Sequence, residues 1–331
     1  MANIRMGSKP LAEQRFSVPI SQCDVHDRRK LAVYRKQWLK WMGWYEHTPH
    51  EPHSIESQIQ RMIFNDLTYR ATVSVRGAAP NETAIAARAP TLAYLVDQGY
   101  VLSQVLAIQK LLDNRNDVIS ISRLLKDVEK NYLLITREIY VSGDGTPYDY
   151  NSWAAAVPEP GPAVQIWGLE SPGLARYALS RQLHQTFDVL SGRVADQRDR
   201  DDTIRESIFR VLHSWLRGDR AQELKQIRNK FLAHAADSLS RGKLQFNGVK
   251  LSVIDELQRA IIRVERALTD YILSIRVERD VVPIQPLGIF AGLDLPYAPP
   301  GGGDSMDKCW RDLKMDRNSW KHGILQDLDH S

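Results

Sequence analysis

The sequence has few cysteines and no long apolar run, and both absences exclude classes of protein. Only two of its 331 residues are cysteine, Cys23 and Cys309. They are too few for a disulfide framework and too far apart in the chain for a zinc site. No apolar run approaches the roughly 20 residues that span a bilayer, and the polar first residues do not resemble a signal peptide. We therefore expect a cytoplasmic protein that makes no contact with a membrane.

Motifs for metals and cofactors are also missing, and we expect neither. His47, His50 and His53 lie close together, but prolines interrupt them and no cysteine assists, so a solvated loop is favoured over a metal site. The glycines at 301–303 follow two prolines rather than a strand, which indicates a linker and not a nucleotide-binding loop. The net charge of +4 suits a polyanionic partner without requiring one.

Apolar residues recur at helical spacing along most of the chain, and this pattern predicts an all-α fold. Asp117 or Ser120 is suited to cap the helix expected at 117–140. A small turn or hairpin is expected around Asn247-Gly248. The expected helices cover residues 27–45, 55–76, 90–112, 117–140, 174–196, 203–216, 220–236 and 253–277.

Composition divides the chain into an arm, a helical domain and a tail. Residues 1–24 read as a flexible arm, and residues 25–278 as one helical domain. Within the domain, residues 142–173 are rich in proline and glycine, which predicts a long loop. Residues 279–331 form a Pro/Gly-rich tail, with one short helix expected at 306–313.

The first helix has an aromatic stripe beside basic residues, and two interpretations are open. The stripe could be a surface on which RNA bases stack, with Arg35 and Lys36 as RNA-binding candidates; or it could be core, which we favour. The stripe consists of Leu31, Tyr34, Trp38, Trp41 and Tyr45.

Three further features have plain explanations from the sequence. His184 and His213 lie beside apolar residues on expected helices, where a core or surface histidine is favoured over a catalytic one. The run 193–205 alternates in charge, which is typical of a solvated connection.

One helix, at 220–236, places polar residues where chemistry is possible. Setting Leu224 at zero and turning about 100° per residue puts Arg228 near +40°, inside the apolar arc, and His234 near −80° at its edge. Asn229 falls near +140°, away from the centre of the arc. A buried guanidinium needs a partner. That partner is either a carboxylate of a neighbouring helix or a phosphate, and the sequence leaves both open.

These residue types fit RNA cleavage without a metal. A neutral His234 can take or return a proton, Arg228 can stabilise charge on the phosphate in the transition state, and Asn229 can orient either group. Lys230 adds a cation for RNA binding. Arg228 and His234 are six positions apart, about 120° out of phase and about 9 Å along a straight helix. Either the chain bends there or a second protomer completes the site, so we expect a homodimer.

The run Ile227-Arg-Asn-Lys-Phe-Leu-Ala-His234 resembles the signature of HEPN-domain ribonucleases, an Arg, a polar residue and then a His. The wider context is similar to the AbiU2-like branch, associated with phage abortive infection. In that branch two segments precede the Arg-His helix. The first is a Leu-rich helix end with an Asp/Arg/Asn connection, here residues 106–113, and the second is an Ile-Ser-Ile-Ser-Arg-Leu-Leu-like stretch, here residues 118–125. The resemblance covers about residues 50–275. The first helix and the tail have no counterpart in it.

The resemblance implies a HEPN-like helical bundle, here with an additional N-terminal helix and the irregular 142–173 excursion. It also implies frequent dimerisation and metal-independent endoribonuclease activity, with Arg228 and His234 as the active groups. A toxin or abortive-infection effector of this kind is a candidate for control by an antitoxin or another regulatory protein. The alternative is a non-catalytic helical adaptor that binds RNA or protein, because some HEPN proteins resemble binding modules. Turnover of RNA separates the two.

Overall fold

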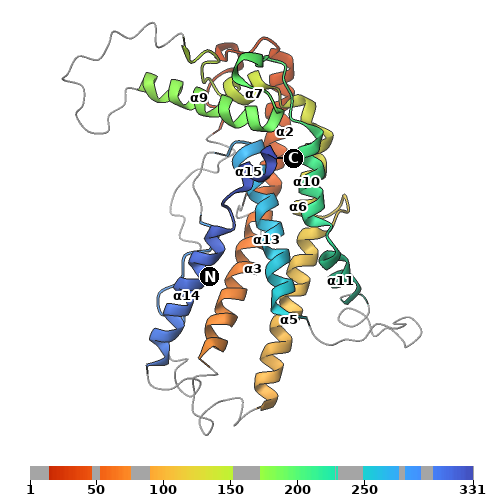
Figure 1. Cartoon of the computed structure of the whole chain (residues 1–331), viewed down its shortest axis with the longest axis vertical. Helices are drawn as coiled ribbons and strands as arrows, with labels where there is room; N and C mark the ends of the chain where they lie inside the picture. Colours follow the sequence, from red (N-terminus) through yellow and green to blue (C-terminus); the bar gives the residue numbers. More distant parts are fainter. Residues whose placement is uncertain are drawn as a thin grey trace, which may run out of the picture.

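The chain folds into an elongated assembly of helices (Figure 1). The computed structural model describes residues 15–46, 53–75, 90–151, 172–227, 229, 249–275, 280–291 and 301–330. Within these residues there is no strand, only an isolated antiparallel bridge between Thr136 and Thr203. The expected all-α fold is confirmed.

Four long helices form one side of the bundle. α3 (Ile55–Ser74) packs between α5 (Pro90–Leu112) and α14 (Gly302–Ser319), and α13 (Leu251–Arg266) packs against α5. Each contributes a buried stripe at helical spacing, because only one face of each helix is covered. The core they share includes Met62, Ile63, Leu67, Val105, Ile108, Ile254 and Trp310.

A second group of helices covers the other side of α13. α10 (Glu206–Leu216) packs against both α13 and α6 (Ile121–Lys130). The short α11 (Asp219–Ile227) follows α10 and contacts α5 and α13. Consequently α5, α6, α10 and α11 come together on one flank of the bundle (Figure 1).

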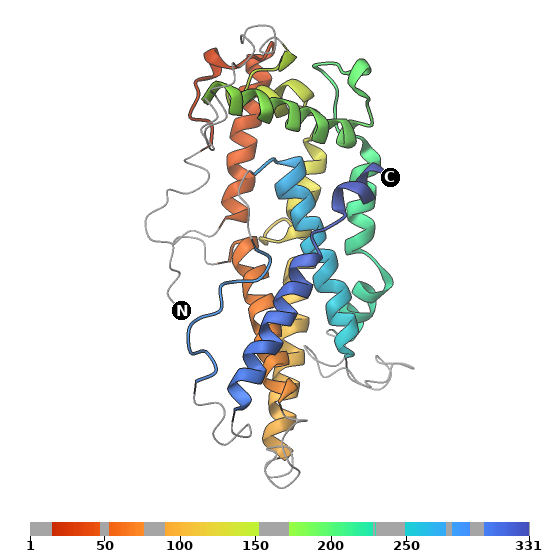
Figure 2. The same cartoon turned by 60° about the vertical axis from the view of Figure 1, so that its left-hand side comes forward.

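At one end of the bundle the helices change direction. α9 (Pro172–Ser191) lies across this end in Figure 2, packed against α7 (Arg137–Ser142) and α15 (Ile324–Asp329). α2 (Arg28–Tyr45) descends from the same end and contacts α3. Short 3-10 turns connect these elements at Ile20–Gln22, Tyr132–Leu134 and Ala195–Gln197.

The aromatic stripe of α2 is core, as favoured above. Leu31, Tyr34, Trp38, Trp41 and Tyr45 are each at most 2% exposed. The indole Nε1 of Trp38 donates a hydrogen bond to Leu273 O at 3.2 Å. The alternative, an open surface for base stacking, is wrong because no face of these rings is available to a ligand.

Side-chain caps explain where several helices begin. An N-cap oxygen accepts one of the backbone N–H groups that the first turn leaves unpaired. Asp27 accepts from Lys30 N at 2.8 Å and begins α2, and Ser120 accepts from Arg123 N at 3.1 Å and begins α6. Of the two residues suited to cap the helix expected at 117–140, the structure therefore uses Ser120 rather than Asp117.

The single helix expected at 117–140 is divided in two. α6 ends at Lys130, where Asn131 Nδ2 donates back to Asp127 O at 2.7 Å. Thr136 then pairs with Thr203, and Arg137 N donates to Asp202 O at 2.9 Å. A backbone engaged with a distant segment cannot also continue the helix, so α7 starts anew.

The last expected helix, 253–277, changes its winding before it ends. α13 stops at Arg266, and Ala267–Ile272 (η6) form a π-helical segment. Its end supplies carbonyls to neighbours: Tyr271 O accepts from Tyr140 Oη at 2.6 Å. The wider turn is thus tied to α7 and α2, whereas periodicity alone predicts an uninterrupted α-helix.

The arm and the tail are more integrated than composition predicts. The last residues of the expected arm belong to the core: Cys23 is buried, and the Phe16 ring meets Trp38 edge to face at 5.1 Å. From Gly302 the expected tail is helical and packs on α3, with Met306 and Trp310 buried. In both segments aromatic side chains pack against the bundle, and this accounts for both differences.

Parts of several predictions lie outside the described residues. They include residues 1–14 of the arm, the middle of the 142–173 excursion, the turn or hairpin around Asn247-Gly248, and His47 and His50. The described end of the excursion, up to Asn151, packs on the bundle through Tyr148.

Candidate functional site

The structure describes the start of the predicted site but not its centre. α11 ends at Ile227, and Asn229 continues the helical path, half-buried. Arg228, Lys230 and His234 lie outside the described residues. Within α11 the apolar arc is buried at Leu224, and Ile227 is half-buried. The structure therefore describes the surroundings of α11, which lie next to the predicted catalytic residues in the chain.

A groove runs beside α11 on the flank where α5, α6 and α10 meet it. Its walls are the end of α5, the connection that follows it, one side of α6, and the corner between α10 and α11. Its cavity volume is ≈ 620 Å³, within the roughly 300–1,000 Å³ of ligand-binding cavities. Uncharged lining side chains include Gln109, Asn114, Ser122, Leu216, Ala221 and Gln222.

The charged side chains of this groove are mostly basic. Arg115, Lys126, Arg217 and Lys225 line it and are exposed, against one lining carboxylate, Asp113. Asp113 pairs with Arg115 at 3.0 Å, and this hydrogen bond raises the pKa of Arg115 further. Within the described part of the chain, no carboxylate lies at ion-pair distance from the other three cations.

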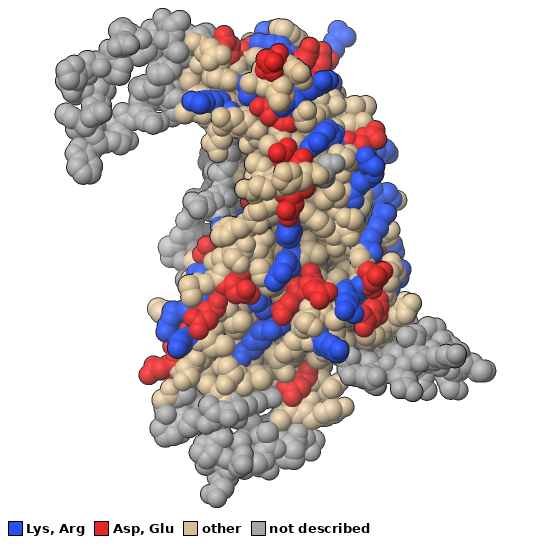
Figure 3. Space-filling view, in the orientation of Figure 1, with Lys and Arg blue, Asp and Glu red and all other residues tan. Residues whose placement is uncertain are grey.

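Figure 3 shows the same imbalance from outside. Lys and Arg side chains follow the right-hand edge of the molecule, where Figure 1 places α6, α10 and α11, with carboxylates among them. Three basic residues of this edge line the groove: Lys126 from α6, Arg217 from the end of α10 and Lys225 from α11.

A histidine also lines the groove. His213 on α10 has its Nε2 2.8 Å from Oε2 of Glu129 on α6. The sequence favours a core or surface role for it, and the structure places it half-buried at the groove wall. The carboxylate fixes the ring between two helices, so the imidazole adds a positioned polar group to the groove.

Sequence reasoning missed Lys126, Arg217 and Lys225 as a set. Each stands on a different helix, and only the packing of α6, α10 and α11 brings them together. A partial indication was available, because Arg115 belongs to the Asp/Arg/Asn connection noted above, which forms one end of the groove.

The other RNA-binding candidates are separate from this groove. Arg35 and Lys36 lie on α2, in the upper part of the bundle in Figure 1, whereas α11 is in the lower part. Lys36 is exposed. Arg35 contacts other parts of the protein: Nη2 donates to Gly143 O at 2.8 Å, and the guanidinium lies 4.8 Å from the Phe16 ring centre. Arg35 therefore has a clear structural role.

A second arginine-rich region, at the end of the bundle, is closed. Arg137 on α7 is fully buried, with Nε 2.9 Å from Asp202 and Nη1 2.8 Å from Asp188. Its Nη2 donates to Ser191 Oγ at 3.0 Å. Arg198 binds Asp188 through Nε at 2.9 Å and Nη2 at 2.6 Å. Each of these guanidiniums thus has carboxylate partners.

This cluster corrects the prediction for residues 193–205. The run is not simply a solvated connection, because Arg198 and Asp202 from it are part of the network around Arg137. Alternating charge indicates solvation only when the charges have no buried partner. Here the partner is on α7, distant in sequence.

A third ionic cluster holds α14 to the bundle. Asp66 on α3 is fully buried and accepts from Arg70 Nε at 2.9 Å and from Arg317 Nη2 at 3.1 Å. Asp255 on α13 binds the same two arginines, at 2.8 and 2.9 Å. Tyr100 Oη of α5 donates to Asp66 as well. Four helices thus meet at this cluster.

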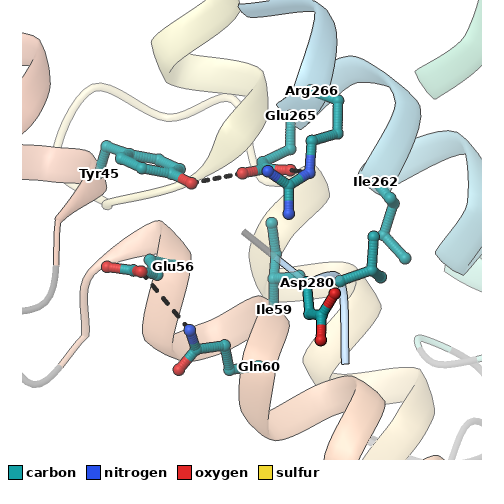
Figure 4. Close-up of a pocket in the computed structure, with 9 residues that line it drawn as sticks. Tyr45, Glu56, Ile59, Gln60, Ile262, Glu265, Arg266 and Asp280 are labelled. Carbon is teal, nitrogen blue, oxygen red and sulfur yellow. Dashed lines mark hydrogen bonds and ion pairs between the residues drawn. The ribbon is translucent and has the colours of Figure 1, made fainter. Parts of the chain in front are cut away.

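The pocket in Figure 4 is too small for a ligand. Its volume is ≈ 20 Å³, about the space that one water molecule requires. Tyr45 Oη donates to Glu265, and Arg266 Nε lies 3.2 Å from the same carboxylate, while Gln60 Nε2 donates to Glu56. The Tyr45–Glu265 hydrogen bond joins α2 to α13, and the other contacts lie within α3 or α13, so the cluster is structural.

His184 is the other histidine considered from sequence, and it is buried at the closed end. Its Nε2 lies 2.9 Å from Tyr148 O, and its Nδ1 has no hydrogen-bond partner among the described residues. Burial lowers the pKa of His184, and burial also raises the pKa of Tyr148 to about 12. The core interpretation of His184 is confirmed.

Two features are absent from the described residues. No group of three or more His, Cys, Asp or Glu side chains there is placed to hold a metal ion. No described helix combines the length and apolarity needed to cross a membrane.

Comparison with protein families gives one match. The family model HEPN_AbiU2, described as AbiU2, matches residues 59–281, about two thirds of the chain. The match includes the groove walls and the whole Arg228–His234 run, and it excludes α2 and α14. No curated protein and no solved structure matches the chain. The chain therefore belongs to the HEPN AbiU2 family.

Proposed function

We propose that the protein is a metal-independent endoribonuclease of HEPN type, acting as a toxin or abortive-infection effector in phage defence. The observation that carries the proposal is the family match, because residues 59–281 contain Arg228, Asn229 and His234 in the spacing of the ribonuclease signature. The basic groove beside α11 supports it with a surface suited to a polyanion.

The proposed reaction needs only protein side chains. The ribose 2′-oxygen attacks the phosphorus, the bond to the 5′-oxygen breaks, and a 2′,3′-cyclic phosphate and a 5′-hydroxyl form. His234 takes the 2′-hydroxyl proton or returns one to the leaving oxygen. Arg228 stabilises the added negative charge of the transition state, and Asn229 orients one of these groups.

The position of Asn229 links the signature to the groove. Gln222 and Lys225 line the groove from α11, three residues apart, and Asn229 follows Lys225 by four residues. Residues at these spacings share one side of a helix. The groove therefore leads towards the point on the chain where the signature begins.

Dimerisation and control remain parts of the proposal. Arg228 and His234 diverge on a straight helix, so two protomers around a two-fold axis are expected to complete the site. An antitoxin or another regulatory protein is the expected inhibitor. Lys230, Arg35 and Lys36 stay RNA-binding predictions, with Lys36 favoured over Arg35 because Arg35 is engaged by Gly143 and Phe16.

The test is cleavage of RNA in EDTA by the purified chain and by Arg228→Ala and His234→Ala. We expect cleavage by the parent chain and a loss of about 10²-fold or more in each variant. Arg311→Ala and His322→Ala are matched controls, because both residues are exposed on or after α14 and outside the family match. Metal-free cleavage that persists in both site variants would contradict the assignment. RNA binding without turnover by the parent chain would favour the adaptor.

A further inference from the structure

The basic groove is built for the backbone of a nucleic acid rather than for its bases. Its described lining has four Lys or Arg side chains, several amide or hydroxyl groups and no Phe, Tyr or Trp. Cations and amides donate to phosphate oxygens, whereas unstacked bases are usually held on aromatic rings. The chemistry of the lining is thus sequence-tolerant.

The cations of the groove are available. Lys126, Arg217 and Lys225 are exposed, and in the described part of the chain none has an ion-pair partner. The arginines around Arg137 show the contrast, since each cation there is matched by carboxylates. Three unmatched cations on three helices that face one cavity indicate an anionic ligand with several charges.

The shape of the groove favours one strand over two. A cavity of ≈ 620 Å³ between helices admits a segment of a single chain. A duplex is held on a broad surface that reaches two successive minor grooves, about 16 base pairs. The corner of α10 and α11 and the end of α5 form a cleft instead.

We propose that this groove binds single-stranded RNA through its phosphates, with Lys126, Arg217 and Lys225 as the contacts and little dependence on base sequence. It delivers the strand to the end of α11. The inference rests on the proposed function for the identity of the polymer as RNA, and it assigns to the groove a role that the Arg228–His234 signature does not specify. His213, fixed by Glu129, adds a polar contact at the same wall.

The experiment measures binding separately from cleavage. The probe is a fluorescein-labelled single-stranded RNA with 2′-O-methyl groups, which cannot form a cyclic phosphate. Fluorescence anisotropy follows its binding to the full chain over a range of salt concentrations. The groove variant combines Lys126→Ala, Arg217→Ala and Lys225→Ala.

The matched control combines Arg181→Ala, Lys308→Ala and Arg311→Ala. These residues are exposed on α9 and α14, and their replacement removes the same charge. Circular dichroism and thermal unfolding verify that both triple variants fold.

We expect the groove variant to bind the probe on the order of tenfold or more weakly, and the control to bind like the parent chain. Each phosphate contact contributes about −0.7 to the slope of log affinity against log salt, so the slope should lose about two. Probes of different base composition should bind the parent chain alike, and a duplex of the same sequence more weakly.

Equal losses in the groove variant and the control would overturn the groove assignment, and so would no loss in either. Duplex binding as tight as single-strand binding would overturn the choice of strand. These outcomes do not depend on catalysis. A chain that binds the probe through the groove but cleaves no RNA would contradict the proposed function and would still support the groove assignment.

Discussion

Two regions of this molecule are rich in arginine and lysine, and they treat charge in opposite ways. Around Arg137 the cations are buried, and Asp188 and Asp202 accept from them at 2.8 and 2.9 Å. In the groove beside α11 the cations are exposed, and three of them have no carboxylate partner in the described part of the chain. In the first region the ion pairs hold three segments together, and for the second we propose that the cations bind an anionic ligand.

The comparison predicts opposite effects of mutation. Removing a buried cation from the closed region takes hydrogen bonds away from buried carboxylates, which is costly to the fold. Removing a cation from the groove leaves the fold unchanged and weakens an anion site. The predictions below test this contrast, starting from the largest effect on stability.

Arg137→Ala is expected to cost the most. It removes the fully buried guanidinium that joins Asp188 to Asp202 and leaves each carboxylate with one arginine that is more exposed, Arg198 or Arg193. The free energy of unfolding should fall by about 3–5 kcal/mol. Urea denaturation measures it. Arg193→Ala is the control, because Arg193 also pairs with Asp202, at 3.3 Å, but is exposed and should cost less than about 1 kcal/mol. Similar losses of unfolding free energy in both variants would contradict the expected difference between the buried Arg137 and the exposed Arg193.

Arg317→Ala should come next, at about 2–4 kcal/mol. The loss is smaller because Arg70 still joins Asp66 to Asp255 after Arg317 is removed, whereas Arg198 and Arg193 each pair with only one of the two carboxylates around Arg137. Thermal unfolding of the full chain measures it. The result also tests whether α14, outside the family match, is part of the folding unit. An unchanged unfolding temperature would mean that α14 contributes little.

The pH dependence of stability should report His184. Burial lowers the pKa of His184 in the folded chain, so the unfolded chain binds this proton more tightly. The contribution of the neutral His184 to the free energy of unfolding is then fully present above the ordinary histidine pKa of 6.5, and it is lost as the pH falls below that value towards the lower pKa of the folded chain. Urea midpoints between about pH 5 and about pH 8 measure this. His184→Gln should flatten the profile, and an equally steep profile in that variant would rule out His184 as its source.

The groove triple variant should have the smallest effect on stability. Lys126, Arg217 and Lys225 are exposed and have no described ion pair, so each replacement should stay within about 0.5 kcal/mol. The same urea titration applies. A loss comparable to that of Arg137→Ala would show that the groove cations are structural, which removes the distinction between the two regions.

The features predicted well from sequence are those that local periodicity controls. The all-α fold, the buried stripe of α2 and the buried Leu224 of α11 follow from residues three and four apart, which one helix brings together by itself. Ser120 as a cap follows equally from local chemistry. The family resemblance was carried by a continuous run of the chain, and the match over 59–281 confirms it.

The features that sequence did not predict depend on contacts between distant segments. The break before α7 needs Thr203 and Asp202, and the closed network needs Arg137 to meet Asp188. The groove requires α5, α6, α10 and α11 to meet on one flank. Residue spacing along the chain does not predict these contacts, because each depends on how whole helices pack against one another.

Cleavage chemistry tests the central claim most directly. An RNA substrate with a single ribonucleotide in an otherwise 2′-O-methyl strand is incubated with the chain in EDTA, and the ends of the products are identified by mass spectrometry. The account predicts cleavage after that ribonucleotide, a 2′,3′-cyclic phosphate end, and no product with His234→Ala. Cleavage at 2′-O-methyl positions, a requirement for added metal, or unchanged product with His234→Ala would contradict it.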